Sequence, residues 1–237
     1  MPVTEALQKL AEQYPAYGFG LMFKKLRQSG MQWNAKRVYR VYRLLKLNFR
    51  RKGKKRLPNR YPQPLAVPSD INHCWSVDFM SDALMDGRRF RLFNVVDNFN
   101  REALVIDVDL NIPAHRVVRI LERLSGERGY PVFIRSDNGP EFIAAAFAEW
   151  AERHGVILDV IQPGKPMQNG FIERFNKTLR TEILDMYLFR SLSEVRVLTE
   201  QWRTEYNEER PHSSQGNMPP VIYARQKLAG NPNWRWY

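Results

Sequence analysis

Three acidic residues stand in apolar surroundings, where a carboxylate needs a particular reason. Asp78 interrupts an apolar segment at residues 75–80, and Asp137 closes a strand-like segment at residues 133–136. Glu173 lies in a segment rich in phenylalanine and isoleucine. Functional groups of open α/β sheets gather at strand ends. We therefore expect these three carboxylates to converge at one end of a sheet.

The chemistry of such a trio is that of a divalent metal site. Three carboxylates close together cannot all remain ionised unless a cation lies between them. Hard oxygen ligands of this kind suit Mg²⁺ or Mn²⁺. Two such ions about 3.5–4 Å apart would hold the attacking and leaving oxygens of an in-line phosphoryl displacement. Asp78, Asp137 and Glu173 are thus candidate ligands for two ions in a phosphoryl-transfer site.

Each of these carboxylates also has a simpler interpretation. Asp137 begins an Asp-Asn-Gly-Pro sequence, which is good turn chemistry without any catalytic role. Periodicity alone does not choose Asp78 over Asp97, which lies on a neighbouring predicted strand. The competing acidic residues on these strands are Asp82, Asp86, Asp97, Asp107 and Asp109.

The elements that must position the trio follow from hydrophobic periodicity and turn residues. Strands are expected over residues 74–80, 90–96, 103–110, 132–135 and 156–161, and helices over residues 115–125, 141–154, 169–187 and 195–207. Asp86 and Gly87 mark the turn between the first two strands, so the first three strands form a meander. The resulting order βββαβαβα predicts a mixed α/β sheet with helices on its faces.

Residues 1–49 have the pattern of a small helical domain. Apolar residues recur there at three-to-four spacing, Gly30 is expected to end one helix, and Asn34 is expected to cap the next. The capped helix carries its basic residues on faces away from its apolar ones; these residues are Lys36, Arg37, Arg40 and Arg43. A helix-turn-helix-like DNA-binding unit and a plain helical hairpin with a basic exterior both fit this pattern.

The net charge of +12 is concentrated at the N-terminal end of the chain. Residues 1–62 hold eight lysines and eight arginines against two glutamates, a net charge of +14, whereas residues 63–237 carry −2. Residues 50–70 form a basic, proline-rich linker that could follow a phosphate backbone through Lys52, Lys54 and Lys55. A polyanion such as DNA is the expected partner, and an idle basic surface is the alternative.

Composition excludes several other classes of protein. The single cysteine, Cys74, can form neither an internal disulfide nor a multi-cysteine metal cluster. The chain has no run of eighteen apolar residues and no export signal in its first residues. With 237 residues and 43% hydrophobic content, it can form one sizeable core and a second, smaller one. We expect a cytoplasmic, nucleoid-associated protein that makes no contact with a membrane.

Longer motifs identify a family. The segments that carry the likeness are Trp-Ser-Val-Asp-Phe at residues 75–79, Ser-Asp-Asn-Gly-Pro-Glu-Phe at residues 136–142, and residues 162–180. Together they resemble the second-frame (OrfB-type) transposases of bacterial insertion sequences, the IS-three family within the retroviral-integrase superfamily. Asp137 and Glu173 are separated by thirty-five residues, the spacing typical of this family.

The resemblance covers nearly the whole chain and implies both a fold and a set of metal ligands. It implies a ribonuclease-H-like catalytic core at residues 71–190, followed by a C-terminal helical extension at residues 191–237. Within this core it assigns Asp78, Asp137 and Glu173 as the triad that binds Mg²⁺ or Mn²⁺.

The resemblance also implies contacts to DNA near the triad. The family carries a basic residue seven places after its catalytic glutamate, which here is Arg180. Seven residues fall about 20° short of two helical turns, so Arg180 projects from nearly the same face as Glu173. A surface ion pair with Glu182 or Asp185 is the alternative. Lys177, one turn after Glu173, and Lys165, in the loop at residues 162–168, are further DNA candidates, and a solvated charge is the alternative for Lys177.

The function implied is metal-dependent cleavage at the 3′ ends of a mobile element, followed by strand transfer into DNA. The partners implied are double-stranded DNA, further copies of the chain on that DNA, and either the upstream-frame protein or a frameshift fusion with it. Two rivals remain open: a DNA-binding regulator with a silent second domain, and a ribonuclease-H-like nuclease that hydrolyses without joining.

Overall fold

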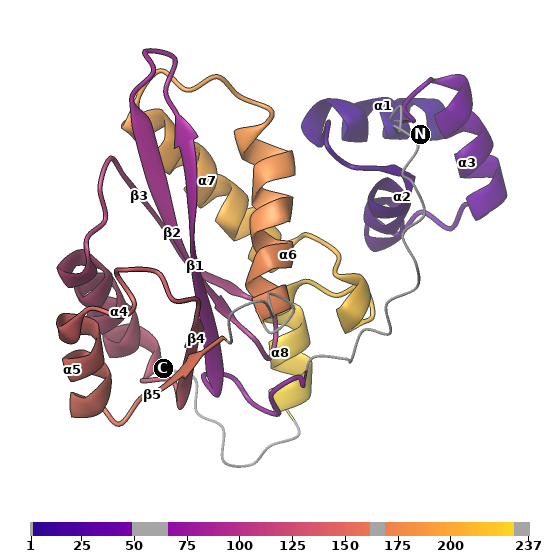
Figure 1. Ribbon diagram of the computed structural model, residues 1–237. Helices are drawn as coiled ribbons and strands as arrows, with labels where there is room; N and C mark the ends of the chain where they lie inside the picture. The colour runs from indigo at the N-terminus through magenta and orange to yellow at the C-terminus, as the bar shows by residue number, and fades with distance from the viewer. Residues whose placement is uncertain (1, 49–65, 162–168, 230–237) are drawn as a thin grey trace, which may run out of the picture. The chain divides into compact units, whose positions relative to one another are not determined.

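The computed structural model describes residues 2–48, 66–161 and 169–229, which belong to two compact units, residues 1–64 and residues 65–237. The first unit consists of the helices α1 (Val3–Gln13), α2 (Phe19–Gln28) and α3 (Ala35–Leu44) (Figure 1). These helices enclose their own apolar core. As predicted, the side chain of Asn34 caps α3, accepting a hydrogen bond of 2.9 Å from the backbone N–H of Lys36.

The second unit is built on a five-stranded sheet in the order β3-β2-β1-β4-β5. The strands are β1 (Cys74–Ala83), β2 (Arg89–Asp97), β3 (Ala103–Asp109), β4 (Phe133–Ser136) and β5 (Ile157–Val160). The first three pair antiparallel as a meander, whereas β4 runs parallel to β1 and β5 runs parallel to β4. This topology confirms the predicted mixed sheet.

Helices cover both faces of the sheet (Figure 1). One face carries α4 (Ala114–Arg128) and α5 (Ala145–Arg153), and the other carries α6 (Gly170–Leu179), the π-helical turn η2 (Arg180–Leu184) and α7 (Leu192–Glu208). A short 3-10 turn, η3 (Ser213–Gln215), and α8 (Pro220–Leu228) complete the described chain. No helix in these described segments is long and apolar enough to cross a bilayer.

Strand alternation assigns the side chains of β1 to these two faces, because successive residues point to opposite sides. Trp75 and Val77 are fully buried in the cluster formed with α4 and α5. Met80 belongs to the cluster formed with α6 and α7. Asp78 has the same parity as Met80. It therefore points toward the α6 side of the sheet.

Two predicted helices are shorter than expected. The helix predicted over residues 141–154 begins at Ala145, because the preceding residues form a turn in which Phe142 is buried, with 3% of its surface exposed. The helix predicted over residues 169–187 changes at Arg180 into the π-helical turn, closed by the N–H of Asp185 on the Arg180 carbonyl at 2.8 Å. The wider turn allows two consecutive apolar residues, Ile183 and Leu184, to be buried together.

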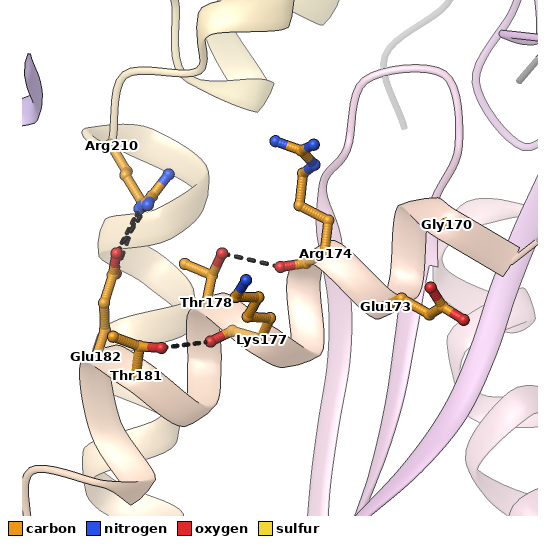
Figure 2. A pocket seen from close by; sticks show the side chains of 8 residues that line it. All are labelled: Gly170, Glu173, Arg174, Lys177, Thr178, Thr181, Glu182 and Arg210. Atoms are coloured by element: carbon orange, nitrogen blue, oxygen red, sulfur yellow. Dashed lines mark hydrogen bonds and ion pairs between the residues drawn. The ribbon is translucent and has the colours of Figure 1, made fainter. Parts of the chain in front are cut away.

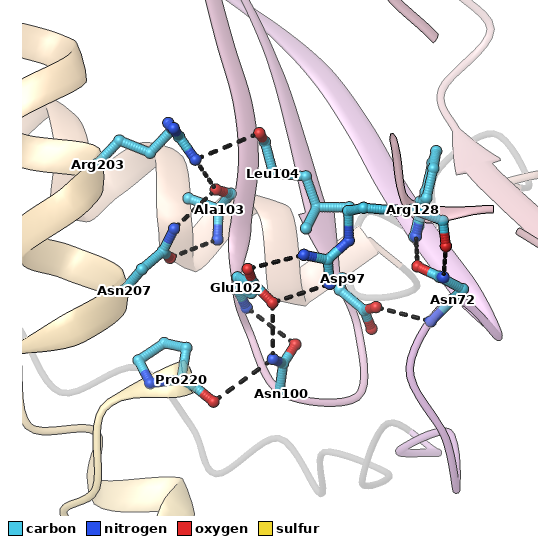
Figure 3. A network of polar contacts seen from close by, with 11 residues as sticks. Asn72, Asp97, Asn100, Glu102, Ala103, Leu104, Arg128, Arg203, Asn207 and Pro220 are labelled. Carbon is cyan, nitrogen blue, oxygen red and sulfur yellow. Dashed lines mark hydrogen bonds and ion pairs between the residues drawn. The ribbon is translucent and has the colours of Figure 1, made fainter. Parts of the chain in front are cut away.

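Helix α7, in the predicted C-terminal extension, shares its core with the sheet. Val195, Trp202 and Tyr206 belong to the same cluster as the α6-facing residues of β1 and β2. The predicted boundary after residue 190 thus falls inside one compact unit. Figure 3 shows that the amide of Asn207 accepts from the N–H of Ala103 and donates to its carbonyl, at 2.8 and 3.0 Å. This side chain pairs with the backbone at the start of β3, the edge strand.

A buried polar network surrounds Asp97, the main competitor of Asp78. Its carboxylate is fully buried and accepts the backbone N–H of Asn72 at 2.8 Å (Figure 3). It also accepts the backbone N–H of Phe99 at 2.8 Å. Asn72 also donates to the carbonyl of Arg128, at 2.6 Å. Burial raises the pKa of Asp97 to about 6 against the effect of these hydrogen bonds. Asp97 thus joins the entry to β1, the turn after β2 and the end of α4.

Candidate active site

Pairing registers place Asp78 at the centre of a row across three strands. Asp78 lies opposite Asn94 in the antiparallel pair of β1 with β2. In the parallel pair of β1 with β4, Ser76 lies beside Arg135. Two residues farther along both strands, Asp78 is level with Asp137, the first residue after β4. Neighbours in such a row point to the same face of a sheet. The Asp78 carboxylate is therefore directed toward the α6 side, and Asp137 lies near enough for its charge to raise the pKa of Asp78.

The turn that carries Asp137 is closely packed. The carboxylate of Asp137 accepts the backbone N–H of Gly139 at 3.0 Å. A Cβ atom at Gly139 would lie 3.0 Å from that carboxylate oxygen and 3.3 Å from the ring of Phe142, so a side chain at this position would require a neighbour to shift. The turn chemistry proposed for the Asp-Asn-Gly sequence is thus present, and it orients Asp137.

An ion pair ties the residues after this turn to the sheet. Glu141 binds Arg91 on β2. The Arg91 guanidinium also lies over the ring of Phe79, 4.0 Å from its centroid, and Phe79 stacks on Phe142 at 5.4 Å. Because Phe79 follows Asp78 directly, these contacts link the surroundings of Asp78 with the turn that holds Asp137.

Glu173 reaches the site from α6. Its helix is held against the sheet by buried apolar residues on the opposite face, Ile172, Phe175 and Leu179. Glu173 itself is exposed and lines a groove of about 520 Å³ along α6. Figure 2 shows the groove, which is lined by Gly170, Glu173, Arg174, Lys177, Thr178, Thr181, Glu182 and Arg210.

Electrostatics couple the three carboxylates. The pKa of Asp78 is raised to about 6, chiefly because the carboxyl group is buried, and further by the negative charges of Asp137 and Glu173. Hydrogen bonds from the N–H of Phe79 and the amide of Asn176, both at 2.8 Å, act in the opposite direction. The repulsion among the three carboxylates is of the kind that a bound cation relieves.

The donor set fits a hard divalent cation, since all three side chains offer carboxylate oxygens. Within the described residues, no three aspartate, glutamate, histidine or cysteine side chains form a group that could hold a metal ion as they stand. Asp137, which follows β4, and Glu173 on α6 lie near enough to Asp78 on β1 for their charges to raise its pKa.

The other acidic candidates are engaged elsewhere. Asp97 lies on the sheet face opposite α6, because it has the parity of Phe93 and Val95 in the cluster formed with α4 and α5. The remaining four form ion pairs with arginines: Asp82 with Arg180, Asp86 with Arg88, and Asp107 and Asp109 with Arg116.

Arg180 is bound to the end of β1. Its guanidinium donates to the Ser81 carbonyl at 2.8 Å, lies 3.3 Å from the Asp82 carboxylate and lies 3.8 Å from Asp185. The surface ion pair considered for Arg180 is thus present with Asp185, whereas Glu182 pairs with Arg210 at 2.7 Å (Figure 2). A DNA phosphate would have to compete with these contacts.

Both units carry exposed basic side chains. Lys177 and its neighbour Arg174 are exposed on α6, and in the described segments neither forms an ion pair. All four predicted basic residues of α3 are exposed; Lys36, Arg40 and Arg43 line a groove together with Tyr39 and Leu44. The remaining DNA candidates, Lys52, Lys54, Lys55 and Lys165, lie outside the described residues.

The sequence analysis did not predict two buried asparagines that are linked to Asp78. Asn94 is fully buried and Asn176 is 9% exposed, and they link to Asp78 by hydrogen bonds. An asparagine within the apolar strand 90–96 is a signal that could have been used, because asparagine is depleted in strands. The pairing of Glu141 with Arg91 had no such signal, since charged residues at turns and strand ends are common.

Comparisons with known proteins agree with this architecture. Two family models described as Integrase core domain match residues 68–166 and residues 154–220. The chain is 40% identical over 223 residues to the insertion element IS407 uncharacterized 31.7 kDa protein of Burkholderia multivorans, covering 94% of this chain and 80% of that protein. It is 29% identical over 228 residues to the transposase InsD for insertion element IS2D of Escherichia coli, covering 91% and 75%.

A shorter but stronger match covers part of the chain. Over 97 residues it is 84% identical to the Low calcium response locus protein T of Yersinia pestis, covering 41% of this chain and 69% of that protein. Among solved structures, the catalytic core domain of BIV integrase matches the fold with a TM-score of 0.50 at 19% identity, covering 67% of this chain and 97% of that chain. The chain belongs to the insertion-element transposases, a family of transposase/integrase enzymes with an integrase core domain of ribonuclease-H-like fold.

Proposed function

We propose that this protein cleaves the 3′ ends of an insertion element and transfers them into DNA, using Asp78, Asp137 and Glu173 as the metal-binding triad. The observation that supports it most directly is the nearness of Asp137, after β4, and Glu173, on α6, to Asp78 on β1, where their charges raise the pKa of Asp78. The family to which the chain belongs supports the DNA substrate.

In this proposal the carboxylates act as ligands more than as proton carriers. Divalent cations held there, Mg²⁺ or Mn²⁺ and most simply two of them, would activate the attacking oxygen and stabilise the charge that develops on the phosphate. Asp78 and Asp137 hold their positions through the sheet, and Glu173 closes the site from α6. In the same proposal, Lys177 on α6 and Arg180 in the π-helical turn that follows it bind the DNA backbone, Arg180 in exchange for its present contacts.

A joining assay tests the proposed function. The full chain is incubated with a labelled oligonucleotide that carries the element's end and with Mg²⁺ or Mn²⁺, and the products are separated by length. We expect both shortened strands and longer, joined strands, all of which disappear when the metal is chelated. Shortened strands alone would indicate a nuclease, and DNA binding without any product would indicate a regulator.

The proposed assembly consists of several copies of the chain on DNA. Two element ends must be joined to one target, so a homo-oligomer on double-stranded DNA is the simplest arrangement. Two further arrangements are part of the same proposal: association with the upstream-frame protein, and a frameshift fusion with it. Cross-linking on end DNA, with and without the upstream-frame protein, distinguishes them by the mass of the complex.

The exposed face of α3 is proposed to bind the phosphate backbone. Arg40→Ala removes one exposed guanidinium, and we expect the slope of log Kobs against log salt to fall by about 0.9 for each lost phosphate contact. Fluorescence anisotropy with a labelled duplex over a range of salt concentrations measures this slope. Lys9→Ala, an exposed cation on α1, is the matched control and should leave the slope unchanged. Equal effects of the two variants would contradict a specific role for α3.

A further inference from the structure

Two asparagines form a chain of hydrogen bonds that ends on Asp78. The Asn94 amide on β2 donates to the amide oxygen of Asn176 on α6 at 2.8 Å. The Asn176 amide donates in turn to the Asp78 carboxylate at 2.8 Å. Asn94 is fully buried and Asn176 is 9% exposed. Three elements are therefore joined by hydrogen bonds that end on one proposed metal ligand.

This pairing determines the orientation of the Asn176 amide. An amide group can present either its oxygen or its NH₂ to a neighbour. Because the NH₂ of Asn94 faces the oxygen of Asn176, the NH₂ of Asn176 is directed to Asp78. If Asn176 were reversed, its oxygen would face the carboxylate and repel it. Asn94 thus donates to the one Asn176 atom that Asp78 leaves unused, and so supports the orientation in which Asn176 donates to Asp78.

Fold stability does not account for this arrangement. The amide oxygen of Asn94 is buried and has no hydrogen-bond partner within the described residues. Leaving a buried polar atom unpaired costs about 1–3 kcal/mol. An apolar residue in the same place would pack beside Leu92 and Val96 and remove this unpaired oxygen, but it would leave the buried Asn176 oxygen unpaired in its stead, so the polar pair gives the fold little net stability. The polar pair is better explained by what it does to Asp78.

The position of Asn176 links two members of the triad. It follows Glu173 by three residues on α6, and its side chain is bound to Asp78 on β1. The other Asp78 oxygen accepts the N–H of Phe79 at 2.8 Å. Both carboxylate oxygens are therefore oriented, and the helix that carries Glu173 is held at a defined distance from Asp78.

We infer that Asn94 and Asn176 are positioning residues that preset Asp78 for a divalent cation shared with Asp137 and Glu173. The inference rests on the proposed function. Residues that orient a metal ligand from behind contribute about 10- to 100-fold to metal affinity. Loss of either asparagine should therefore weaken metal binding, and loss of Asn94 should do so without weakening the fold.

Direct metal binding tests this inference. Mn²⁺ is titrated into the full chain, free Mn²⁺ is measured by electron paramagnetic resonance, and the melting temperature is recorded without metal. For Asn94→Leu and Asn176→Leu we expect the Kd for Mn²⁺ to rise about 10- to 100-fold. The melting temperature of Asn94→Leu should stay close to that of the wild type, because the unpaired oxygen of Asn94 is exchanged for that of Asn176. Thr199→Val, at a buried polar residue of α7 outside this chain of hydrogen bonds, should bind Mn²⁺ as the wild type does.

A fourth variant separates this inference from the function on which it rests. Asp78→Asn should lose Mn²⁺ binding. If it does while Asn94→Leu and Asn176→Leu retain wild-type affinity, the positioning role is wrong and the triad stands. If a lower melting temperature accompanies wild-type affinity, the asparagines are structural only. If Asp78→Asn keeps wild-type binding, or the wild type takes up no Mn²⁺, the proposed metal site itself is wrong.

Discussion

Asp78→Asn, Asp137→Asn and Glu173→Gln are each expected to lower both cleavage and joining at least about a thousandfold, which corresponds to on the order of 4 kcal/mol in the activation barrier. Each change keeps the shape of the side chain and removes the negative charge. A neutral amide is a weak ligand for a hard divalent cation. Because Asp78, Asp137 and Glu173 come from three different elements, the loss of one leaves the other two in place.

The measurement is the yield of joined and shortened strands in the assay with end DNA, together with DNA affinity. Affinity should stay close to that of the wild type, since the exposed cations of α3 and α6 are untouched. Glu152→Gln, an exposed glutamate on α5, makes the same chemical change on the opposite side of the sheet and should leave activity unaltered. Activity near the wild-type level in any one triad variant would refute the assignment of that residue.

Asn207→Leu is expected to lower the free energy of unfolding by about 2–4 kcal/mol. The side chain of Asn207 pairs with both backbone groups of Ala103 at the start of the edge strand β3. Arg203 also donates to that carbonyl, at 3.2 Å, so the N–H of Ala103 is the group left buried and unpaired. Loss of this contact should also weaken the packing of α7 on the sheet.

Urea unfolding followed by circular dichroism and by tryptophan fluorescence measures this effect. Trp75 reports on the sheet and Trp202 reports on α7, and both are buried. We expect the transitions seen by the two methods to shift together, because α7 and the sheet share one core. Glu208→Ala, an exposed neighbour, should leave the midpoint unchanged. An early, separate loss of helix that appears in Asn207→Leu and not in the wild type would show that α7 is an independent extension, because the helices of the first unit are the same in both proteins.

Much of the fold could be predicted from local patterns. The meander of three strands follows from alternating apolar residues, and the helix after it follows from apolar residues at helical spacing. Both patterns lie within short stretches of neighbouring residues. The cap of α3 by Asn34 and the turn at Asp137 are equally local. The errors lie at element ends. There, burial of Phe142 and of Ile183 with Leu184 decided the backbone conformation.

The candidate site was predicted less completely. Periodicity did not distinguish Asp78 from Asp97, and resemblance to a family made the choice. In the structure the two residues lie on opposite faces of the sheet. Side chains alternate along a strand, so Asp78 points to the same face as Met80, and Asp97 points to the same face as Val95. The sheet register and the helices packed on each face thus distinguish the two carboxylates physically.

The amino-acid sequence by itself determined which segments become strands and helices, where their charges lie, and which carboxylates interrupt apolar segments. Tertiary structure alone decided which side chains meet. Asn176 contacts Asp78 across 98 residues and Asn94 across 82, and Arg180 reaches Asp82 across 98. Such contacts depend on strand register and on the packing of α6 against the sheet. Both are set by the burial of the whole core, and no local pattern contains that information.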